Sequence, residues 1–231
     1  MTPEEIESRL LYRDALMLIL NKPAGIAVHP GSSKSDSLEQ YFKYLQYGLP
    51  NPPSLAHRLD RETSGCLILG RHRKALSKLG KLFEQKKIEK TYWAVTKGIP
   101  KETKGRIALP LKKLNEKKGW KMVVSEDGQE SITDYQVLGT ANSMAWIEFY
   151  PRTGRTHQIR VHAASIDCPI VGDWVYGDYV KDEIILHLHA RSVTVPLYAS
   201  KPSIHIDAPP PPHMLQSLSM LGLRENQSVP K

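Results

Sequence analysis

Extended segments outnumber helices along this chain, and they follow one another in runs. Compact apolar, β-branched or aromatic stretches that are bounded by turn residues predict strands. We expect strands at residues 16–20, 26–29, 55–58, 66–71, 91–95, 105–110, 120–125, 130–138, 144–150, 184–195 and 203–207. Strands that do not alternate with helices favour an α+β fold over a parallel α/β fold. We therefore expect a mainly antiparallel, mixed central sheet that is flanked by helices.

Helical spacing is clearest in one segment, where Leu76, Leu79, Leu82 and Phe83 share a face and lysines occupy the other. This pattern predicts a helix over residues 74–87. Further helices are expected near the N-terminus and at residues 37–47, 156–166 and 213–222. No linker divides the chain, so we expect a leader over residues 1–15 and one domain over residues 16–222.

The charge balance indicates an anionic partner. The 231 residues include 32 Lys and Arg against 24 Asp and Glu, which gives a net charge of +8. The first partner to consider is nucleic acid, although a basic protein that binds nothing has the same totals. Five lysines gather in a predicted loop or hairpin, where they serve either solubility or phosphate contact: Lys112, Lys113, Lys117, Lys118 and Lys121.

Cysteine usage and apolar runs exclude several classes of protein. Cys66 and Cys168 are far apart and form no CxxC pair, so a disulfide scaffold or a zinc site is not expected. The N-terminus has no signal-peptide pattern, and no apolar run approaches the length of a membrane span. We expect a cytoplasmic protein that needs no membrane and no metal.

The richest chemical segment is His57-Arg58-Leu59-Asp60-Arg61-Glu62-Thr63-Ser64-Gly65, directly before the apolar run at residues 66–70. It places one carboxylate, Asp60, between two arginines at the edge of a predicted strand. Flanking positive charge favours the ionised carboxylate. Such a group suits a nucleophile or a stabiliser of a developing cation. A structural ion pair explains the same nine residues equally well.

A second segment, at residues 152–162, contains three arginines and two histidines. In a helix, His157, Arg160 and Ala164 would share a face, and the start of that helix could bind an anion. Taken alone, an ordinary basic surface helix explains this segment better. Other catalytic templates are missing from the sequence: it contains no phosphate loop, no GxGxxG, no GxSxG and no HExxH.

Several motifs together resemble the RluA-type pseudouridine synthases. The matching segments are Asn21-Lys22-Pro23-x-Gly25, His57-Arg58-Leu59-Asp60-x-x-Thr63-Ser64-Gly65, Lys90-x-Tyr92, Thr153-Gly154-Arg155-x-His157-Gln158-Ile159-Arg160-Val161-His162, Pro169-Ile170-x-Gly172-Asp173 and Leu188-His189-Ala190. They occur in the order of the family and span residues 16 to 208. The resemblance implies the pseudouridine synthase fold.

The resemblance also implies residue roles. Asp60 resembles the catalytic aspartate, Tyr92 the tyrosine that stacks on the target uracil, and Arg160 the arginine that pairs with the aspartate. These three side chains are expected to share one cavity. Arg58 resembles an arginine that fills the space of the extruded nucleotide. The remaining RNA-binding residues are expected to be His57, Lys90, Arg155 and His157.

The implied activity is the isomerisation of specific uridines to pseudouridine in structured ribosomal or transfer RNA. This reaction needs no redox change and no energy input, so no cofactor is expected. The chain departs from many relatives in that few residues precede the first strand, so no separate N-terminal RNA-binding domain is expected. A monomer is expected, since no apolar helix face is left unmatched. The alternative is a non-catalytic RNA-binding protein that keeps the synthase fold.

Overall fold

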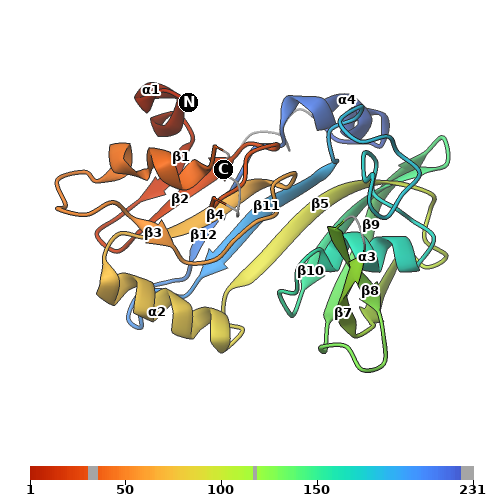
Figure 1. Ribbon diagram of the computed structural model, residues 1–231. Coiled ribbons are helices and arrows are strands. Elements are labelled where there is room, and N and C mark those ends of the chain that lie inside the picture. The colour runs from red at the N-terminus through yellow and green to blue at the C-terminus, as the bar shows by residue number, and fades with distance from the viewer. Residues whose placement is uncertain (31–35, 117–118, 225–231) are drawn as a thin grey trace. The chain divides into compact units, whose positions relative to one another are not determined.

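The computed structural model describes residues 1–30, 36–116 and 119–224, and it divides the chain into two compact units (Figure 1). The first unit comprises residues 1–90 and 190–209, and the second comprises residues 91–189 and 210–224 among those described. The divisions fall inside two strands, after Lys90 and after His189. Each unit combines strands with helices, which confirms the α+β class. None of the described helices is long and apolar enough to cross a membrane.

The first unit contains a sheet with the strand order β1-β2-β4-β11. Its elements are α1 (Pro3–Glu7), β1 (Leu10–Arg13), β2 (Met17–Lys22), the 3-10 helix η1 (Leu38–Leu45), β3 (Ser54–Leu55), β4 (Ser64–Gly70), α2 (Arg73–Glu84), most of β11 (Leu188–Val195) and β12 (Ile204–Asp207). The pairs β1–β2, β2–β4, β3–β4 and β11–β12 are antiparallel.

Strands β2 and β4 form the centre of this unit because each contains an unbroken apolar run, residues 17–20 in β2 and residues 66–69 in β4. Leu20 lies opposite Leu67, and Leu18 lies opposite Leu69. Both strands are buried over almost their whole length, as expected for a sheet that is covered on both faces. Helix α2 packs against β4, and its residues Ala75 and Leu79 are buried.

The second unit contains a sheet with the strand order β5-β10-β9-β6. Its elements are β5 (Glu89–Lys97), which starts in the first unit, β6 (Lys104–Ala108), β7 (Leu111–Glu116), β8 (Gly119–Val124), β9 (Ile132–Ala141), β10 (Met144–Pro151), α3 (Gln158–Ser165) and α4 (Pro212–Met220). The pairs β5–β10, β9–β10 and β6–β9 are antiparallel, in agreement with the prediction.

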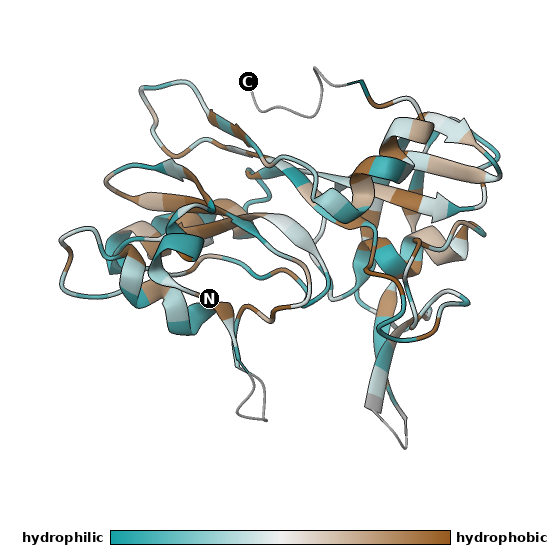
Figure 2. Ribbon diagram, turned by 90° about the horizontal axis from the view of Figure 1, so that it is seen from above, coloured by the Kyte–Doolittle hydropathy of each residue, from teal (hydrophilic) through white to brown (hydrophobic). Residues whose placement is uncertain are grey.

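The two faces of this second sheet bury different cores. On one face Ala94, Ile147 and Phe149 pack with Ile159 and Ala163 of α3. On the other face Trp93 and Trp146 meet edge to face, with ring centroids 4.7 Å apart, and α4 covers them through Met214 and Leu218. Figure 2 shows that apolar and polar residues alternate along the helices of the molecule. Alternate residues of β5 therefore point toward α3 or toward α4.

Strands β7 and β8 form a separate antiparallel hairpin, with Leu114 opposite Lys121 and Asn115 opposite Trp120. The hairpin extends away from the sheet of its unit and is largely hydrophilic (Figures 1 and 2). Lys112, Lys113 and Lys121 of the predicted lysine cluster lie on these paired strands, and Lys117 and Lys118 fall outside the described residues.

Most predicted elements are present with shifted ends, but four details of the prediction were wrong. Residues 26–29 form no strand beyond an isolated bridge at Ala27. Strands β1 and β7 were not predicted as strands. The helix expected from residue 156 begins at Gln158, so His157 precedes it rather than sharing its face with Arg160. The backbone of His157 is left-handed, with φ of 53°.

Candidate functional site

Asp60 lies in the first unit, in the segment that leads into β4. Its side chain is partly buried, and its carbonyl accepts a hydrogen bond of 3.1 Å from the N–H of Thr63. This bond closes a tight turn from Asp60 to Thr63. The neighbouring Arg58 and Arg61 are exposed. The turn therefore carries Asp60 between two exposed arginines, together with a second carboxylate, Glu62.

A buried lysine fixes this turn. Lys22, at the end of β2, has no exposed surface. Its Nζ donates to the carbonyls of Pro23 at 2.7 Å, Ile26 at 2.8 Å and Arg61 at 3.0 Å. Burial lowers the pKa of Lys22 to about 7, while the negative charges of Glu62 and Asp60 oppose that shift. The three carbonyls compensate the buried ammonium, and they tie two loops together.

Gly25 completes this connection. It has φ of 85°, a left-handed value that favours glycine. Its N–H donates to the Arg61 carbonyl at 2.9 Å, and Arg61 Nε donates back to the Gly25 carbonyl at 2.9 Å. The Asn-Lys-Pro-x-Gly motif thus has a structural explanation: its lysine and its glycine both hold the backbone next to Asp60.

His57 also holds the segment in place. Its Nε2 accepts a hydrogen bond of 3.0 Å from the N–H of Ile68 in β4, and its ring lies 5.0 Å from the ring of Phe83. Removal from water lowers the pKa of His57 to about 3, and the positive charge of Lys90 adds to this shift. The imidazole is therefore neutral at pH 7. Burial also lowers the pKa of Lys90. RNA contact by His57 and Lys90 stays a prediction.

The first strand after the turn contains a close backbone approach. Gly65 has φ of 105°, and a Cβ at this position would lie 2.2 Å from the carbonyl oxygen of Ala190 in β11. Only glycine fits here without moving one of the two strands. The Thr-Ser-Gly that follows Asp60 is therefore needed for packing β4 against β11.

Tyr92 lies in the second unit, on β5, opposite Phe149 of β10. Its side chain is partly buried and packs against the core that Ile159 of α3 completes. Tyr92 thus points to the α3 side of the sheet, while Trp93 points to the other side. Tyr92 and Ile159 of α3 thus belong to one core, and a shared cavity of Tyr92 with Arg160 and Asp60 stays a prediction.

Arg160 makes a buried bidentate ion pair with Asp173. Its Nε donates to Asp173 Oδ2 at 2.8 Å and its Nη2 donates to Oδ1 at 2.7 Å. The exposed fraction is 4% for the Arg160 side chain and zero for Asp173. Asp173 Oδ1 also accepts the N–H groups of Val175 and Tyr176 at 3.0 and 3.1 Å. The guanidinium is therefore held in one orientation by a carboxylate from the loop after α3.

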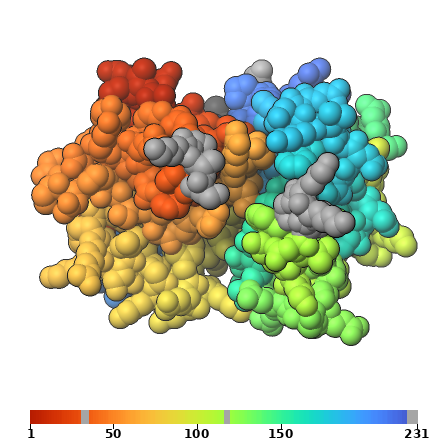
Figure 3. Space-filling view, in the orientation of Figure 1, coloured from red at the N-terminus to blue at the C-terminus, as the bar shows by residue number. Residues whose placement is uncertain are grey.

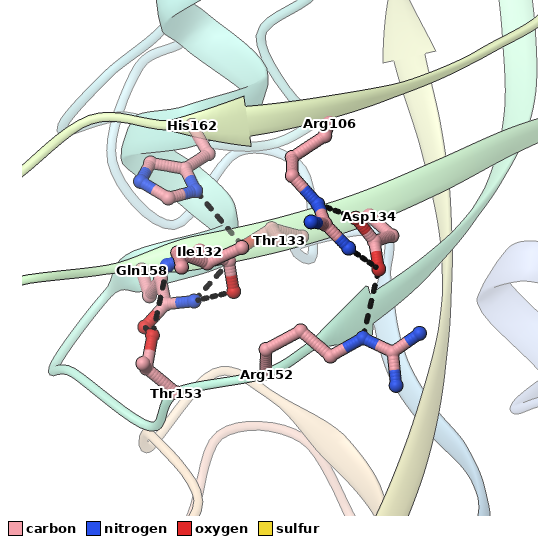
Figure 4. Close-up of polar contacts among 8 residues, drawn as sticks. All are labelled: Arg106, Ile132, Thr133, Asp134, Arg152, Thr153, Gln158 and His162. Atoms are coloured by element: carbon pink, nitrogen blue, oxygen red, sulfur yellow. Dashed lines mark hydrogen bonds and ion pairs between the residues drawn. The ribbon is translucent and has the colours of Figure 1, made fainter.

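A buried polar network attaches the start of α3 to the sheet (Figure 4). Gln158 accepts from the Thr153 hydroxyl at 2.7 Å and donates to the Thr133 hydroxyl at 2.9 Å. His162 Nδ1 lies 2.8 Å from the same Thr133 hydroxyl. Burial lowers the pKa of His162. Because these polar groups satisfy one another, helix α3 and Arg160 have a defined register on β9.

Arg155 and His157 occupy the turn before α3. Arg155 is exposed and its Nε donates to the Glu130 carbonyl at 3.1 Å. His157 Nδ1 lies 2.8 Å from the hydroxyl of Tyr176, and its ring stacks on Trp120 of β8. RNA contact by these two residues remains a prediction, but the turn that carries them is rigidly connected to the hairpin.

Two arginines gather around Asp134, on the face of the sheet opposite to the network of Gln158 and Thr133 (Figure 4). Asp134 of β9 accepts from Arg106 Nε at 2.6 Å and from Arg152 Nε at 2.7 Å. Both arginine side chains are more than half exposed, at 62% and 58%. Together the arginines lower the pKa of Asp134 to about 2. This triad joins β6, β9 and the residue that follows β10, and it leaves a net positive charge on the surface.

The predicted residues thus fall into two groups. The first unit holds His57, Arg58, Asp60 and Lys90, and the second unit holds Tyr92, Arg155, His157 and Arg160. Pairing of Asp60 with Arg160 stays a prediction. Sequence reasoning missed the structural roles of Lys22, Asp173 and Tyr176, although two of these lie inside the quoted motifs. Among the described residues, no group of His, Cys, Asp and Glu could hold a metal ion.

Comparison with known sequences gives a consistent result. The family model described as RNA pseudouridylate synthase matches residues 16–165. An uncharacterized RNA pseudouridine synthase of Zymomonas mobilis is 42% identical over 210 residues, which cover 89% of this chain and 95% of that protein. A ribosomal large subunit pseudouridine synthase C of Buchnera aphidicola is 40% identical over 183 residues, covering 79% of this chain and 58% of that protein.

Comparison with solved structures agrees. The human RNA pseudouridylate synthase domain containing 4 superposes with a TM-score of 0.80 and 29% identity, covering 96% of each chain. A further relative known by its sequence, a mitochondrial pseudouridylate synthase of Mus musculus, is 32% identical over 266 residues, covering 95% of this chain and 71% of that protein. The resemblance drawn from the motifs is confirmed.

Proposed function

Because the chain belongs to the RluA-type RNA pseudouridylate synthase family, we propose that it isomerises specific uridines in structured ribosomal or transfer RNA, with Asp60 as the catalytic carboxylate. The observation that carries this proposal is the fixed turn at Asp60. Lys22 and Gly25 both bond to the Arg61 carbonyl, one residue after the carboxylate. A group whose backbone is held in this way is suited to act on a bound substrate without rearranging.

The chemistry requires a carboxylate next to the ribose. The bond between the uracil nitrogen and the anomeric carbon breaks, the uracil turns, and a carbon–carbon bond to the same carbon forms. Asp60 acts either as a nucleophile at that carbon or as the base that removes a ribose proton in a glycal route. Glycosidases provide the chemical precedent for a carboxylate at an oxocarbenium-like centre. No electron leaves the substrate in either route, so no redox cofactor enters the proposal.

Two residues of the second unit would act beside Asp60: Tyr92 would hold the freed uracil, and Arg160 would stabilise the negative charge of the carboxylate. We assign the stacking role to Tyr92, since its partly buried ring points to the α3 side of β5. Stacking of a base on an aromatic ring stabilises the complex by about 1–3 kcal/mol. We assign the pairing role to Arg160, because Asp173 fixes its guanidinium through two hydrogen bonds. A fixed cation near a carboxylate keeps that carboxylate ionised.

The target uridine would have to leave its base stack to reach Asp60. Extrusion costs a few kcal/mol, and less at a looped site. Arg58, which is exposed two residues before Asp60, would fill the vacated space. Phosphate contacts from Lys90, Arg155 and His157, with His57 supporting the segment, would offset part of the cost.

The proposal also covers the substrate RNA, the extent of the catalytic domain and the cellular compartment. The Buchnera relative, which is named as a ribosomal large subunit enzyme, supports ribosomal RNA as a substrate class. We propose that residues 16–222 act together as one catalytic domain, since the family model spans parts of both units. A monomer in the cytoplasm is the form we expect to be active. The two buried free cysteines are consistent with a reducing compartment.

The decisive experiment compares Asp60→Asn with Glu62→Gln. Glu62 is a carboxylate of the same turn and is paired with Arg61 at 3.5 Å, so its variant controls for loss of local charge. RNA labelled with tritium at uracil carbon five releases tritium when pseudouridine forms. Asp60→Asn should release none while still binding RNA, and Glu62→Gln should retain turnover. Turnover by Asp60→Asn would remove Asp60 from its role.

A genetic experiment identifies the substrate. Pseudouridine mapping of total RNA from cells that lack the gene should show one or a few lost sites. The wild-type gene should restore them, and the Asp60→Asn gene should not. Restoration by Asp60→Asn would contradict the assignment, and it would favour a non-catalytic RNA-binding role for this chain.

A further inference from the structure

We propose that Trp120 is a platform on which an unpaired base of the substrate RNA stacks, next to the target uridine. The proposal deepens the function above and rests on it for the class of ligand. It concerns the β7–β8 hairpin, which the catalytic assignment does not use. In the space-filling view the hairpin, in green, lies on the surface of the second unit beside residues of the loop after α3 (Figure 3).

The indole of Trp120 is exposed and supported from beneath. Its exposed fraction is 44%, which is large for a tryptophan in a folded chain. The imidazole of His157 stacks on it, with ring centroids 5.1 Å apart and planes inclined by 26°. An exposed flat ring backed by a second ring is a geometry that base stacking requires.

The platform is rigid because Tyr176 fixes both of its parts. The Tyr176 hydroxyl accepts the N–H of Met122 in β8 at 3.0 Å. It also lies 2.8 Å from His157 Nδ1, and the two rings meet at 82°. Since the hydroxyl oxygen already accepts from Met122, its proton is available to the imidazole. The hairpin and the turn before α3 are thus joined through one phenol.

The same phenol connects the platform to the predicted catalytic arginine. The guanidinium of Arg160 lies 5.2 Å from the centre of the Tyr176 ring. Asp173, which holds Arg160, also accepts the N–H of Tyr176. A base on Trp120 would therefore be linked to Arg160 through three side-chain contacts, namely Trp120–His157, His157–Tyr176 and Tyr176–Arg160. This places the base in a nucleotide close to the target along the RNA.

The charges around the ring match a polyanion. Lys113 has its Nζ 5.0 Å from the Trp120 ring centre. Lys113 and Arg155 are both exposed, and Arg155 lies two residues before His157. An ammonium at an exposed indole is held weakly, so a base can take its place while the lysine moves to a phosphate. An apolar protein partner would not be matched by these cations.

The test uses binding alone. The probes are a single-stranded octaadenylate and an abasic octamer with the same ribose-phosphate backbone. Trp120→Ala should bind octaadenylate about 5- to 150-fold more weakly than the wild type, the range that corresponds to one stacked base. Trp120→Phe should bind within a few fold of the wild type. Affinity for the abasic octamer should be the same in all three proteins.

A second tryptophan supplies a matched control. Trp174 is 43% exposed, and Lys181 lies 5.3 Å from its ring, but it belongs to no stacked pair of rings recorded among the described residues. Trp174→Ala should leave octaadenylate binding unchanged. Three results would each overturn the platform: equal loss in both alanine variants, no loss in Trp120→Ala, or equal wild-type affinity for the two octamers. None depends on turnover, so the fate of Asp60 is decided separately.

Discussion

Removing either partner of the Arg160–Asp173 pair should strongly destabilise the second unit. Both side chains are almost fully buried, and two hydrogen bonds of 2.8 and 2.7 Å join them. Asp173→Asn keeps the shape and an oxygen acceptor but removes the negative charge that faces the buried guanidinium. Loss of one partner of a buried pair costs about 3–5 kcal/mol. Arg160→Met should cost a similar amount, because it strands the carboxylate.

The double variant should be far less damaged than the sum of the single variants. Replacing both charges leaves no uncompensated ion, and buried pairs are often replaceable by uncharged groups with little loss. The coupling free energy between the two positions should therefore be at least about 2 kcal/mol. All four tryptophans of the chain lie within residues 91–189, so their fluorescence follows the unfolding of the second unit alone.

Urea titrations of the wild type, the two single variants and the double variant measure this coupling. With a slope of about 2–3 kcal/mol per molar, each single substitution should lower the midpoint by about 1–2 M. Single variants within 1 kcal/mol of the wild type, or a double variant whose loss equals the sum, would refute the reasoning. Either result would mean that the pair is accessible to water and contributes only orientation.

Two further predictions concern the first unit. Gly65→Ala should destabilise it by about 2–5 kcal/mol, because of backbone strain and the clash with Ala190. Gly80→Ala, which lies in open space on α2, should stabilise it by about 0.5–1 kcal/mol. Circular dichroism during urea unfolding measures both changes, and equal effects would contradict the close approach of Gly65 to Ala190. The pKa of His57 is lowered from 6.5 to about 3 in the folded protein. As the pH falls, His57 is therefore protonated in the unfolded chain before it is protonated in the folded one. The free energy of unfolding should decrease by about 1–2 kcal/mol between pH 7.5 and pH 5 for this reason. His57→Gln should show a flatter pH dependence than the wild type, and identical slopes would show that the imidazole is accessible to protons.

The sequence predicted what depends on local pattern. β2 and β4 were predicted because Leu16–Leu20 and Cys66–Gly70 are unbroken apolar runs between turns. β1 was not predicted, because Leu-Leu-Tyr-Arg is short, follows a helix directly and becomes a strand only by pairing with β2. β7 was not predicted because its lysines suit a solvated loop as well as a hairpin strand.

The motifs supplied the residues of the proposed site but not the contacts that support them. The motifs indicated Asp60, Tyr92 and Arg160 directly. They also contained Lys22 and Asp173, but the partners of these two could not be read from spacing. Lys22 bonds to a carbonyl 39 residues away, and Asp173 reaches Arg160 only because the loop after α3 folds back. Such contacts depend on burial and on tertiary packing, which a linear pattern does not encode.

The lysine held by three carbonyls has a consequence for the energetics of substrate capture. Ordering a free backbone costs about 1–2 kcal/mol per residue. Residues 60–63 are already ordered during folding, because Lys22 and Gly25 both donate to the Arg61 carbonyl and the Thr63 N–H donates to the Asp60 carbonyl. Binding of an RNA would therefore cost no conformational entropy in this segment. The free energy of the contacts made there would not be reduced by such a cost, so it would contribute fully to the binding affinity and to lowering the activation barrier.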